Sequence, residues 1–238
     1  MPRKQISPAW GVVVSGTRYQ FLDTETEAAF ITLGNIPVLG WSLKAFEEAA
    51  PIEAVLVVAE KRRLGEVESM VRLLGYGKVR KIVAGATQWL KAVQAGVNVL
   101  EDEGPAAVVV HSAARPMVTA STIESVLSAL RRFDVAVAGS PLADTVKLAA
   151  SNGRVTKTVT QGRCWCAHTP QAFLFPELKR AVNAAVKRRQ KVEEDISVLW
   201  EKSKKQVVMV AEDVENIRIT RHDQLHQVAA LVHGPGSV

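Results

Sequence analysis

Apolar, β-branched runs alternate with segments of helical periodicity over the first 140 residues. The runs are short, continuous and rich in valine, which is typical of buried strands in a parallel sheet. The segments between them carry apolar residues at helical spacing. Strands that alternate with helices in this way predict βαβ units with right-handed crossovers. The predicted strands are 11–16, 54–60, 80–85, 106–112 and 134–140, and the predicted helices are 41–49, 61–75, 87–101 and 119–132.

This order of elements predicts a doubly wound α/β fold with a mainly parallel sheet, in which ligands bind at the carboxyl ends of the strands. Ser121 and Glu124 have the spacing of a capping box, so we expect them to begin the helix at 119–132. No period of 20–50 residues recurs, which excludes a solenoid.

The alternation ends after residue 140. Asn152-Gly153 lies between two short β-like runs and predicts a hairpin. This hairpin is polar, and an isolated hairpin is marginal in water, so we expect the arm at 140–162 to pack against a second subunit. The whole chain then forms one domain, 1–232, with a disordered tail at 233–238. The later predicted elements are helices at 176–191, 194–203 and 222–232 and a strand at 206–211.

Composition narrows the class of protein. No apolar run approaches ~18 residues, so we expect no membrane span and a cytoplasmic protein without a signal peptide. Cys164, Cys166 and His168 alternate and would share one face of a strand. No other Cys/His cluster supplies the missing metal ligands, so reduced cysteines in a core are favoured over a metal site.

The formal net charge is +6, which suits an anionic ligand. Much of the excess lies in 177–191 and 201–205. Aromatic residues are 5% of the chain and none interleaves with these charges, so nucleic acid is an unlikely partner and a solvated helix face is favoured.

The segment "VHSAARP" (110–116) places Ser112 and Arg115 at the end of a predicted buried strand. Together with "GSPLADTVKLA", "WCAHTPQAF", "VEEDISVLW", "ENIRITRHDQL" and "LGNIPVLGWSL", it resembles successive blocks of the 2-C-methyl-D-erythritol 4-phosphate cytidylyltransferases. The blocks keep their order and spacing from about residue 11 to 232.

The resemblance implies a nucleotidyltransferase fold and a homodimer whose arm at 140–162 embraces the partner. It also implies that CTP, a sugar-alcohol phosphate and Mg²⁺ meet at one site. The phosphate of methylerythritol phosphate attacks the α-phosphorus in line, and pyrophosphate leaves. Cations and backbone N–H groups have to neutralise the charge that grows on the phosphoryl oxygens.

The family pattern maps onto three groups of candidate residues. Arg115 and Thr169 have alternative structural roles, an ion pair that braces the turn and a hydroxyl that satisfies backbone. Asn216 beside Glu215 fits a turn residue equally well. Candidates for catalysis are Arg18, Ser112 and Arg218; for substrate binding, Arg115, Asp144, Thr145, Arg163, Thr169 and Glu215; and for nucleotide binding, Gly16, Gly85 and Lys91.

Several positions depart from the family. Ala28 stands at a lysine of the phosphate-binding loop, and Asp23, Glu25 and Glu27 give that loop carboxylates that would repel a triphosphate. Ser112 replaces the aspartate that binds Mg²⁺, and a neutral hydroxyl is a poor Mg²⁺ ligand. Further replacements are Gln88 for an arginine, Lys91 for a serine, Gln161 for the substrate-phosphate arginine, and Arg218 for a lysine.

Two hypotheses follow from this mixture. In the first, the protein is a diverged cytidylyltransferase with impaired catalysis that uses Mg²⁺ if it is active. In the second, it is a non-catalytic homodimer that binds a phosphorylated ligand or a protein partner. A nucleic-acid-binding surface on the basic helices is a third, weaker hypothesis, with a steep salt dependence as its test.

Overall fold

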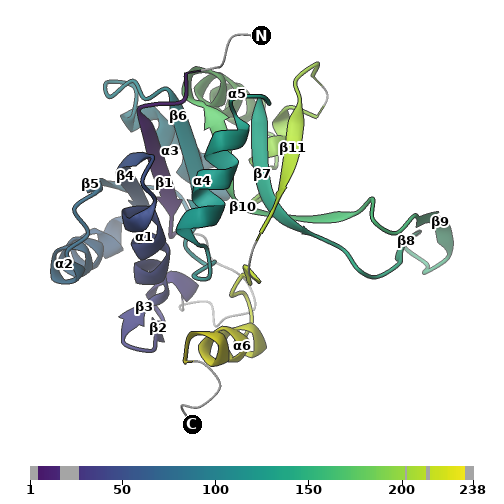
Figure 1. The fold of residues 1–238 in the computed structure, drawn as a ribbon, viewed down its shortest axis with the longest axis horizontal. Coiled ribbons are helices and arrows are strands. Elements are labelled where there is room, and N and C mark those ends of the chain that lie inside the picture. The colour runs from purple at the N-terminus through teal and green to yellow at the C-terminus, as the bar shows by residue number, and fades with distance from the viewer. Residues whose placement is uncertain (1–4, 17–26, 202, 213–214, 234–238) are drawn as a thin grey trace.

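A seven-stranded sheet forms the centre of the molecule in the computed structural model, which describes residues 5–16, 27–201, 203–212 and 215–233 (Figure 1). The strand order is β11-β7-β10-β6-β1-β4-β5. Only β10 runs antiparallel to its neighbours among these strands, so the predicted mainly parallel sheet is confirmed. The strands are β1 (Ala9–Val14), β4 (Ile52–Ala59), β5 (Val79–Ala84), β6 (Ala107–Ser112), β7 (Val135–Pro141), β10 (Trp165–Leu174) and β11 (Val207–Ala211).

Helices cover both faces of the sheet, as a doubly wound fold requires. One hydrophobic core joins the sheet to α1, α2 and α4, and a second joins its other face to α3, α5 and η3. A smaller cluster packs α6 beside the short β2–β3 pair, at the lower end of the sheet in Figure 1. The helices are α1 (Val38–Glu48), α2 (Leu64–Leu74), α3 (Trp89–Val99), α4 (Ala120–Ala129), α5 (Phe175–Lys187) and α6 (His222–His233).

The predicted capping box is wrong. Thr119 caps α4, because its Oγ1 accepts the N–H of Thr122 at 3.1 Å. Glu124 instead accepts the N–H of Ala50 at 3.0 Å and ties α4 to the end of α1. The tertiary contact prevails over the local sequence signal at this helix start.

The predicted helix at 194–203 is also wrong. Among the described residues of this segment, the only helical element is the 3₁₀ turn η3 (Ile196–Leu199), which Asp195 caps by accepting the N–H of Ser197 at 3.0 Å. Ile196 and Trp200 from this segment are buried in the second hydrophobic core. Such apolar spacing fits a buried turn as well as a helix.

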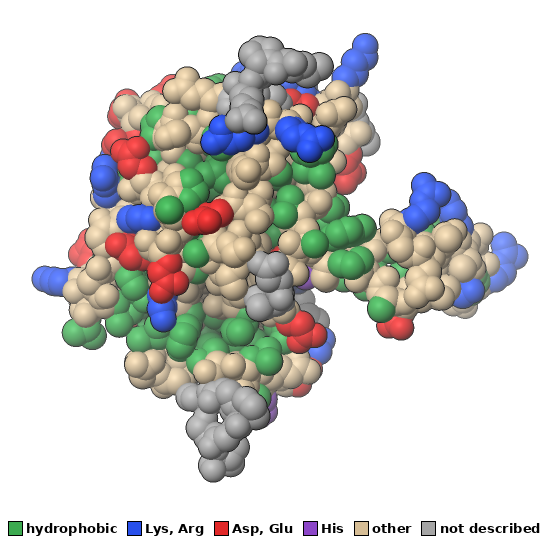
Figure 2. Space-filling view, viewed as in Figure 1, with side chains coloured by type: hydrophobic (Ala, Val, Ile, Leu, Met, Phe, Trp, Pro, Cys, Tyr) green, Lys and Arg blue, Asp and Glu red, His purple; other side chains and the backbone are tan. Residues whose placement is uncertain are grey.

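The Asn152-Gly153 hairpin is present. β8 (Val146–Ala149) pairs with β9 (Val155–Val159), Gly153 has a φ of 82°, and the Asn152 side chain accepts the N–H of Arg154. The arm projects from the body in Figure 1. Figure 2 shows apolar side chains where it leaves the body and basic side chains toward its outer end.

Three strands were absent from the sequence prediction: β2 (Thr32–Leu33), β3 (Ile36–Pro37) and β10. β10 begins in the exposed stem of the arm and becomes buried only from Thr169 onward. Its hydrophobic pattern therefore changes midway, which hides it from a search for uniform strands. No helix within the described part of the chain is long and apolar enough to cross a membrane.

Candidate active site

The end of β6 carries a chain of hydrogen bonds that includes Ser112. The backbone N–H of Ser112 donates to Oγ1 of Thr169 at 3.0 Å. Nε2 of His111 lies 3.1 Å from the carbonyl oxygen of Arg115, and its Nδ1 lies 3.2 Å from the Thr169 hydroxyl. Burial lowers the pKa of His111 to about 3, so its ring is neutral near pH 7.

These contacts determine which atom donates and which accepts in each of these hydrogen bonds. The carbonyl of Arg115 can only accept, so Nε2 of His111 carries the ring hydrogen and Nδ1 accepts from Thr169. The hydroxyl of Thr169 therefore gives its one hydrogen to His111 and takes one from Ser112. Thr169 thus has the predicted structural role, in which its hydroxyl satisfies a backbone N–H. A phosphate would have to compete with His111 for the hydroxyl hydrogen.

Arg115 and Arg218 share one carboxylate. Oε2 of Glu194 lies 3.3 Å from Nε and Nη2 of Arg115 and 2.9 Å from Nη1 of Arg218. Burial lowers the pKa of Arg115, and the charge of Glu194 opposes that shift. The structure thus gives Arg115 the bracing ion pair.

Asn216 ties this cluster to β10. Its carbonyl accepts from Nη1 of Arg115 at 2.7 Å, and its side-chain amide donates to the carbonyl of Thr169 at 2.7 Å. The same amide donates to Glu212, whose other oxygen lies 2.6 Å from Nδ1 of His168. Asn216 is therefore a buried connector rather than a simple turn residue. Sequence reasoning missed Glu194 and Glu212, although Glu194 lies within the "VEEDISVLW" block.

Ser112 does not fit a Mg²⁺ ion. Its side chain is fully buried, and its Oγ has no hydrogen-bond partner within the described residues. No group of three or more His, Cys, Asp or Glu side chains in those residues could hold a metal ion, including the segment with Cys164, Cys166 and His168. The Asn216 amide that donates to the carbonyl of Thr169 also donates to Glu212, and the Asn216 carbonyl accepts from Arg115, so charges of both signs adjoin this network.

The predicted nucleotide edge lies at the ends of β1, β4 and β5. Gly85 needs its lack of a side chain, because a Cβ there would lie 2.2 Å from Cγ1 of Val58. A Cβ on Gly16 would lie 3.3 Å from the backbone nitrogen of Glu60. Lys91 is exposed in the first turn of α3. Arg18, Asp23 and Glu25 lie outside the described residues.

Glu27 is a buried, paired carboxylate and not an exposed charge of the phosphate-binding loop. Its side chain has no exposed surface, and Oε1 accepts from Arg62 and, at 3.2 Å, from Arg63. Ala28, at the lysine position, is 3% exposed and packs with Leu33 and Ile219. Position 28 therefore belongs to a hydrophobic cluster.

The remaining predicted residues lie on the arm or its stem, except Glu215, which follows β11. Asp144, Thr145 and Arg163 are exposed, and no hydrogen bond or ion pair between described residues joins them to Glu194 or its two arginines. Gln161 donates to the carbonyl of Ala143 at 2.8 Å and so braces the stem. Glu215 is exposed beside Asn216. One chain alone does not bring the arm residues to the cluster.

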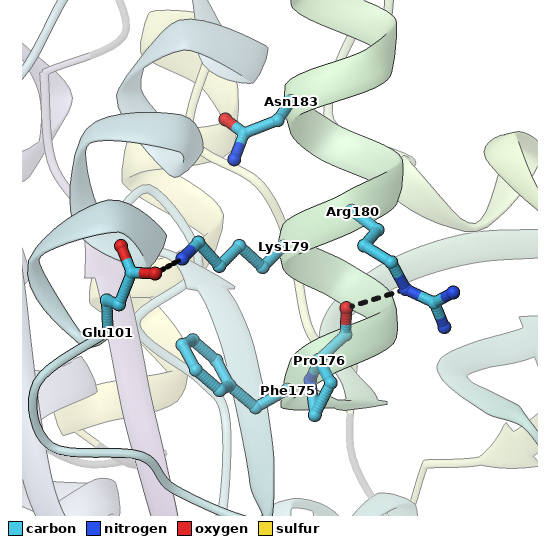
Figure 3. Close-up of a pocket in the computed structure, with 6 residues that line it drawn as sticks. All are labelled: Glu101, Phe175, Pro176, Lys179, Arg180 and Asn183. Carbon is cyan, nitrogen blue, oxygen red and sulfur yellow. Dashed lines mark hydrogen bonds and ion pairs between the residues drawn. The ribbon is translucent and has the colours of Figure 1, made fainter.

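A hollow of about 620 Å³ lies between α3 and α5 (Figure 3). α5 follows Leu174, which pairs with Ala107 at the start of β6, so this hollow lies at the opposite edge of the sheet from Ser112. Lys179 is paired with Glu101, and Arg180 donates to the carbonyl of Pro176 at 3.3 Å. It contains none of the predicted site residues.

Comparisons with known proteins place this geometry in a family. The family model described as 2-C-methyl-D-erythritol 4-phosphate cytidylyltransferase matches residues 7–233. The protein of that name from Pelotomaculum thermopropionicum is 30% identical over 222 residues, covering 93% of this chain and 92% of the relative. The one from Shouchella clausii is 33% identical over 195 residues, covering 82% of this chain and 83% of the relative.

A solved structure supports the fold. The 4-diphosphocytidyl-2C-methyl-D-erythritol synthase of Anaerococcus prevotii superposes with a TM-score of 0.84, covering 95% of this chain and 98% of that one at 20% identity. The family model spans nearly the whole chain, and the sheet order and the Ser112–Thr169 edge lie within it. The chain belongs to the 2-C-methyl-D-erythritol 4-phosphate cytidylyltransferase family.

Proposed function

We propose that the protein transfers a cytidylyl group from CTP to methylerythritol phosphate as a homodimer, at a rate well below that of an ordinary enzyme. A phosphate oxygen of methylerythritol phosphate forms a bond to the α-phosphorus of CTP. The bond from the α-phosphorus to the bridging oxygen breaks, and pyrophosphate leaves with that electron pair. No proton has to move, so the protein contributes positioning and charge.

The observation that carries the proposal is the Arg115–Glu194–Arg218 cluster within a full-length family match. Guanidinium groups bind phosphate with paired N–H donors. Arg218 is 35% exposed at its side chain, so it can meet a ligand while Arg115 remains buried behind it.

The slow rate follows from the groups around the reacting atoms. Ser112 offers a hydroxyl where a metal-binding carboxylate is expected, Ala28 is packed away, and Gln161 carries no charge. The loss of one contact to transition-state charge slows a reaction by about 10²–10³-fold. The residues present do not fit Mg²⁺, so no step of the proposal depends on a metal held by this chain.

The second subunit completes the site through the arm. Leu148 and Val155 on the arm are 50% and 53% exposed, and Trp165 in its stem is 37% exposed. Apolar side chains on a two-stranded hairpin need a partner surface. We therefore assign the exposed Asp144, Thr145 and Arg163 to the site of the partner subunit.

A second candidate function is a non-catalytic homodimer that binds a phosphorylated ligand. The fully buried Ser112 and the packed Ala28 favour it, since both remove chemistry without disturbing the fold.

The test is pyrophosphate release from CTP with methylerythritol phosphate and Mg²⁺, using the full chain. We expect turnover at least a hundredfold below the ~1–10 s⁻¹ of ordinary enzymes. Turnover within that ordinary range would contradict the impaired rate. Binding of methylerythritol phosphate with no detectable pyrophosphate release would favour the second candidate.

A further inference from the structure

The chain that follows β4 runs between the two glycines predicted to bind a nucleotide. The N–H of Ser15 donates to the carbonyl of Val58 at 2.8 Å, on the side of Gly16. The N–H of Gly85 donates to the carbonyl of Ala59, also at 2.8 Å, on the other side. The residues directly after Ala59 therefore lie at the same end of the sheet as Gly16 and Gly85.

Those residues form a short basic turn, η2 (Lys61–Arg63). Nε of Arg62 donates to Glu60 at 2.9 Å, and its Nη2 donates to Glu27. Glu27 immediately precedes Ala28, the position from which a lysine is missing. A cation from a different strand thus lies next to the place where the family pattern expects one.

The two arginines of this turn differ in how many contacts they make within the protein and in how exposed their side chains are. Arg63 donates to Glu27 at 3.2 Å and to Glu66 at 2.5 Å, and its guanidinium lies 4.5 Å from the centre of the Phe30 ring. Its side chain is 23% exposed, whereas that of Arg62 is 49% exposed. Arg63 therefore braces the turn and contacts only Oε1 of Glu27, whose Oε2 is buried without a hydrogen-bond partner within the described residues.

Arg62 keeps unused donors. A guanidinium has five N–H groups, and the contacts to Glu60 and Glu27 use one on Nε and one on Nη2. Within the described part of the chain, both groups on Nη1 and the second on Nη2 remain for a ligand. The two carboxylates hold the planar group in one orientation, so binding to it orders little additional side chain.

We propose that Arg62 binds the phosphoanhydride of a nucleoside triphosphate at this edge and supplies the cation that position 28 lacks. The proposal rests on the proposed cytidylyl transfer for the identity of the nucleotide. The planar guanidinium of an arginine can donate two parallel N–H groups to two phosphate oxygens, whereas a lysine ammonium attracts phosphate as a point charge. In this proposal the phosphate-binding cation follows β4, whereas the family pattern places it at position 28.

The experiment measures binding of CTP and of inorganic pyrophosphate to the full chain by calorimetry at fixed ionic strength. We expect Arg62→Gln to weaken both by about 10- to 100-fold and to leave the affinity for methylerythritol phosphate unchanged. The matched control is Arg72→Gln, an exposed arginine at the other end of α2, which should change either affinity by less than about twofold.

Arg62→Lys keeps a cation beside Glu27 and preserves folding if Arg62→Gln does not. It should weaken CTP binding by a smaller factor, because the charge stays and the fork is lost. Wild-type affinity in a folded Arg62 variant would overturn the proposal, as would a wild-type chain that binds neither CTP nor pyrophosphate. Arg62-dependent pyrophosphate binding without any transfer would contradict the proposed function alone.

Discussion

Oε2 of Glu194 accepts a hydrogen bond from Nη1 of Arg218 at 2.9 Å and another from Nη2 of the buried Arg115 at 3.3 Å. Glu194 is 9% exposed and Arg115 is 6% exposed, so neither charge is well solvated. The carboxylate holds two cations close together that would otherwise repel each other. This makes Glu194 a positioning residue for the proposed phosphate site.

The first prediction concerns the substitution Glu194→Gln. It removes the carboxylate that is hydrogen-bonded to the buried guanidinium of Arg115, so we expect a loss of about 3–5 kcal/mol in the free energy of unfolding. The matched control is Glu66→Gln, which removes an exposed partner of Arg63 and should change stability by less than about 1 kcal/mol. Denaturant unfolding measures both, and equal losses would contradict the shared-carboxylate role.

The second prediction compares two hydroxyl groups of the same network. Ser112→Ala removes a buried Oγ without a partner in the described residues, so it should be neutral or stabilise by up to about 1 kcal/mol. Thr169→Val removes a hydroxyl that links Ser112 to His111 and should destabilise by about 1–3 kcal/mol. Thermal unfolding at one pH distinguishes them. A larger loss for Ser112→Ala would show a hidden partner for its Oγ.

The sheet could be predicted from the sequence because its central strands are buried on both faces and read as continuous valine-rich runs. The run that ends at Ser112 is fully buried along its whole length. β10 could not be predicted in the same way, since its exposed first half belongs to the arm and only its second half enters the core. Uniform burial makes a strand visible, and a change of environment conceals it.

The site could be predicted in its positions but not in its contacts. Arg115, Thr169 and Arg218 were identified from the family pattern, and the structure brings them to one edge. Glu194 could not be identified as their counter-ion, because the pairing joins residues separated by 79 positions. The same applies to Glu27: a local charge count suggests repulsion, whereas Arg62 neutralises it from another strand end.

The third prediction is a pH dependence of stability. His111 has a pKa of about 3 in the folded protein against 6.5 when unfolded, because burial disfavours its charged form. The unfolded chain therefore binds more protons between these values, and stability falls as the pH is lowered through 6.5 toward 3. We expect a loss of about 1.4 kcal/mol per pH unit from this group well below pH 6.5.

The measurement for His111 is denaturant unfolding between pH 7 and pH 5. His111→Asn removes the titrating ring and should flatten the profile, although it lowers stability at pH 7. Parallel profiles for wild type and His111→Asn would contradict the buried neutral histidine.

The fourth prediction concerns the dimer. Leu148→Glu places a charge on the exposed apolar face of the arm and should convert a dimer to a monomer at micromolar concentration, measured by light scattering. Leu73→Glu is the matched control, since Leu73 is 85% exposed on α2 and should leave the mass unchanged. A monomeric wild type would contradict the assignment of Asp144, Thr145 and Arg163 to the partner's site.

The last prediction is that restoring the family lysine by Ala28→Lys damages the protein instead of activating it. Ala28 is 3% exposed and lies in a cluster with Val38, Ala114 and Val228. A lysine there buries an ammonium without a partner, which we expect to destabilise the fold by about 2–4 kcal/mol with no gain in cytidylyl transfer. Ala28→Met adds similar length without charge, so denaturant unfolding of the two variants separates overpacking from the buried charge. A stable Ala28→Lys variant with faster pyrophosphate release would show that position 28 does reach the ligand. The phosphate-binding cation would then belong to the loop before α1 and not to Arg62.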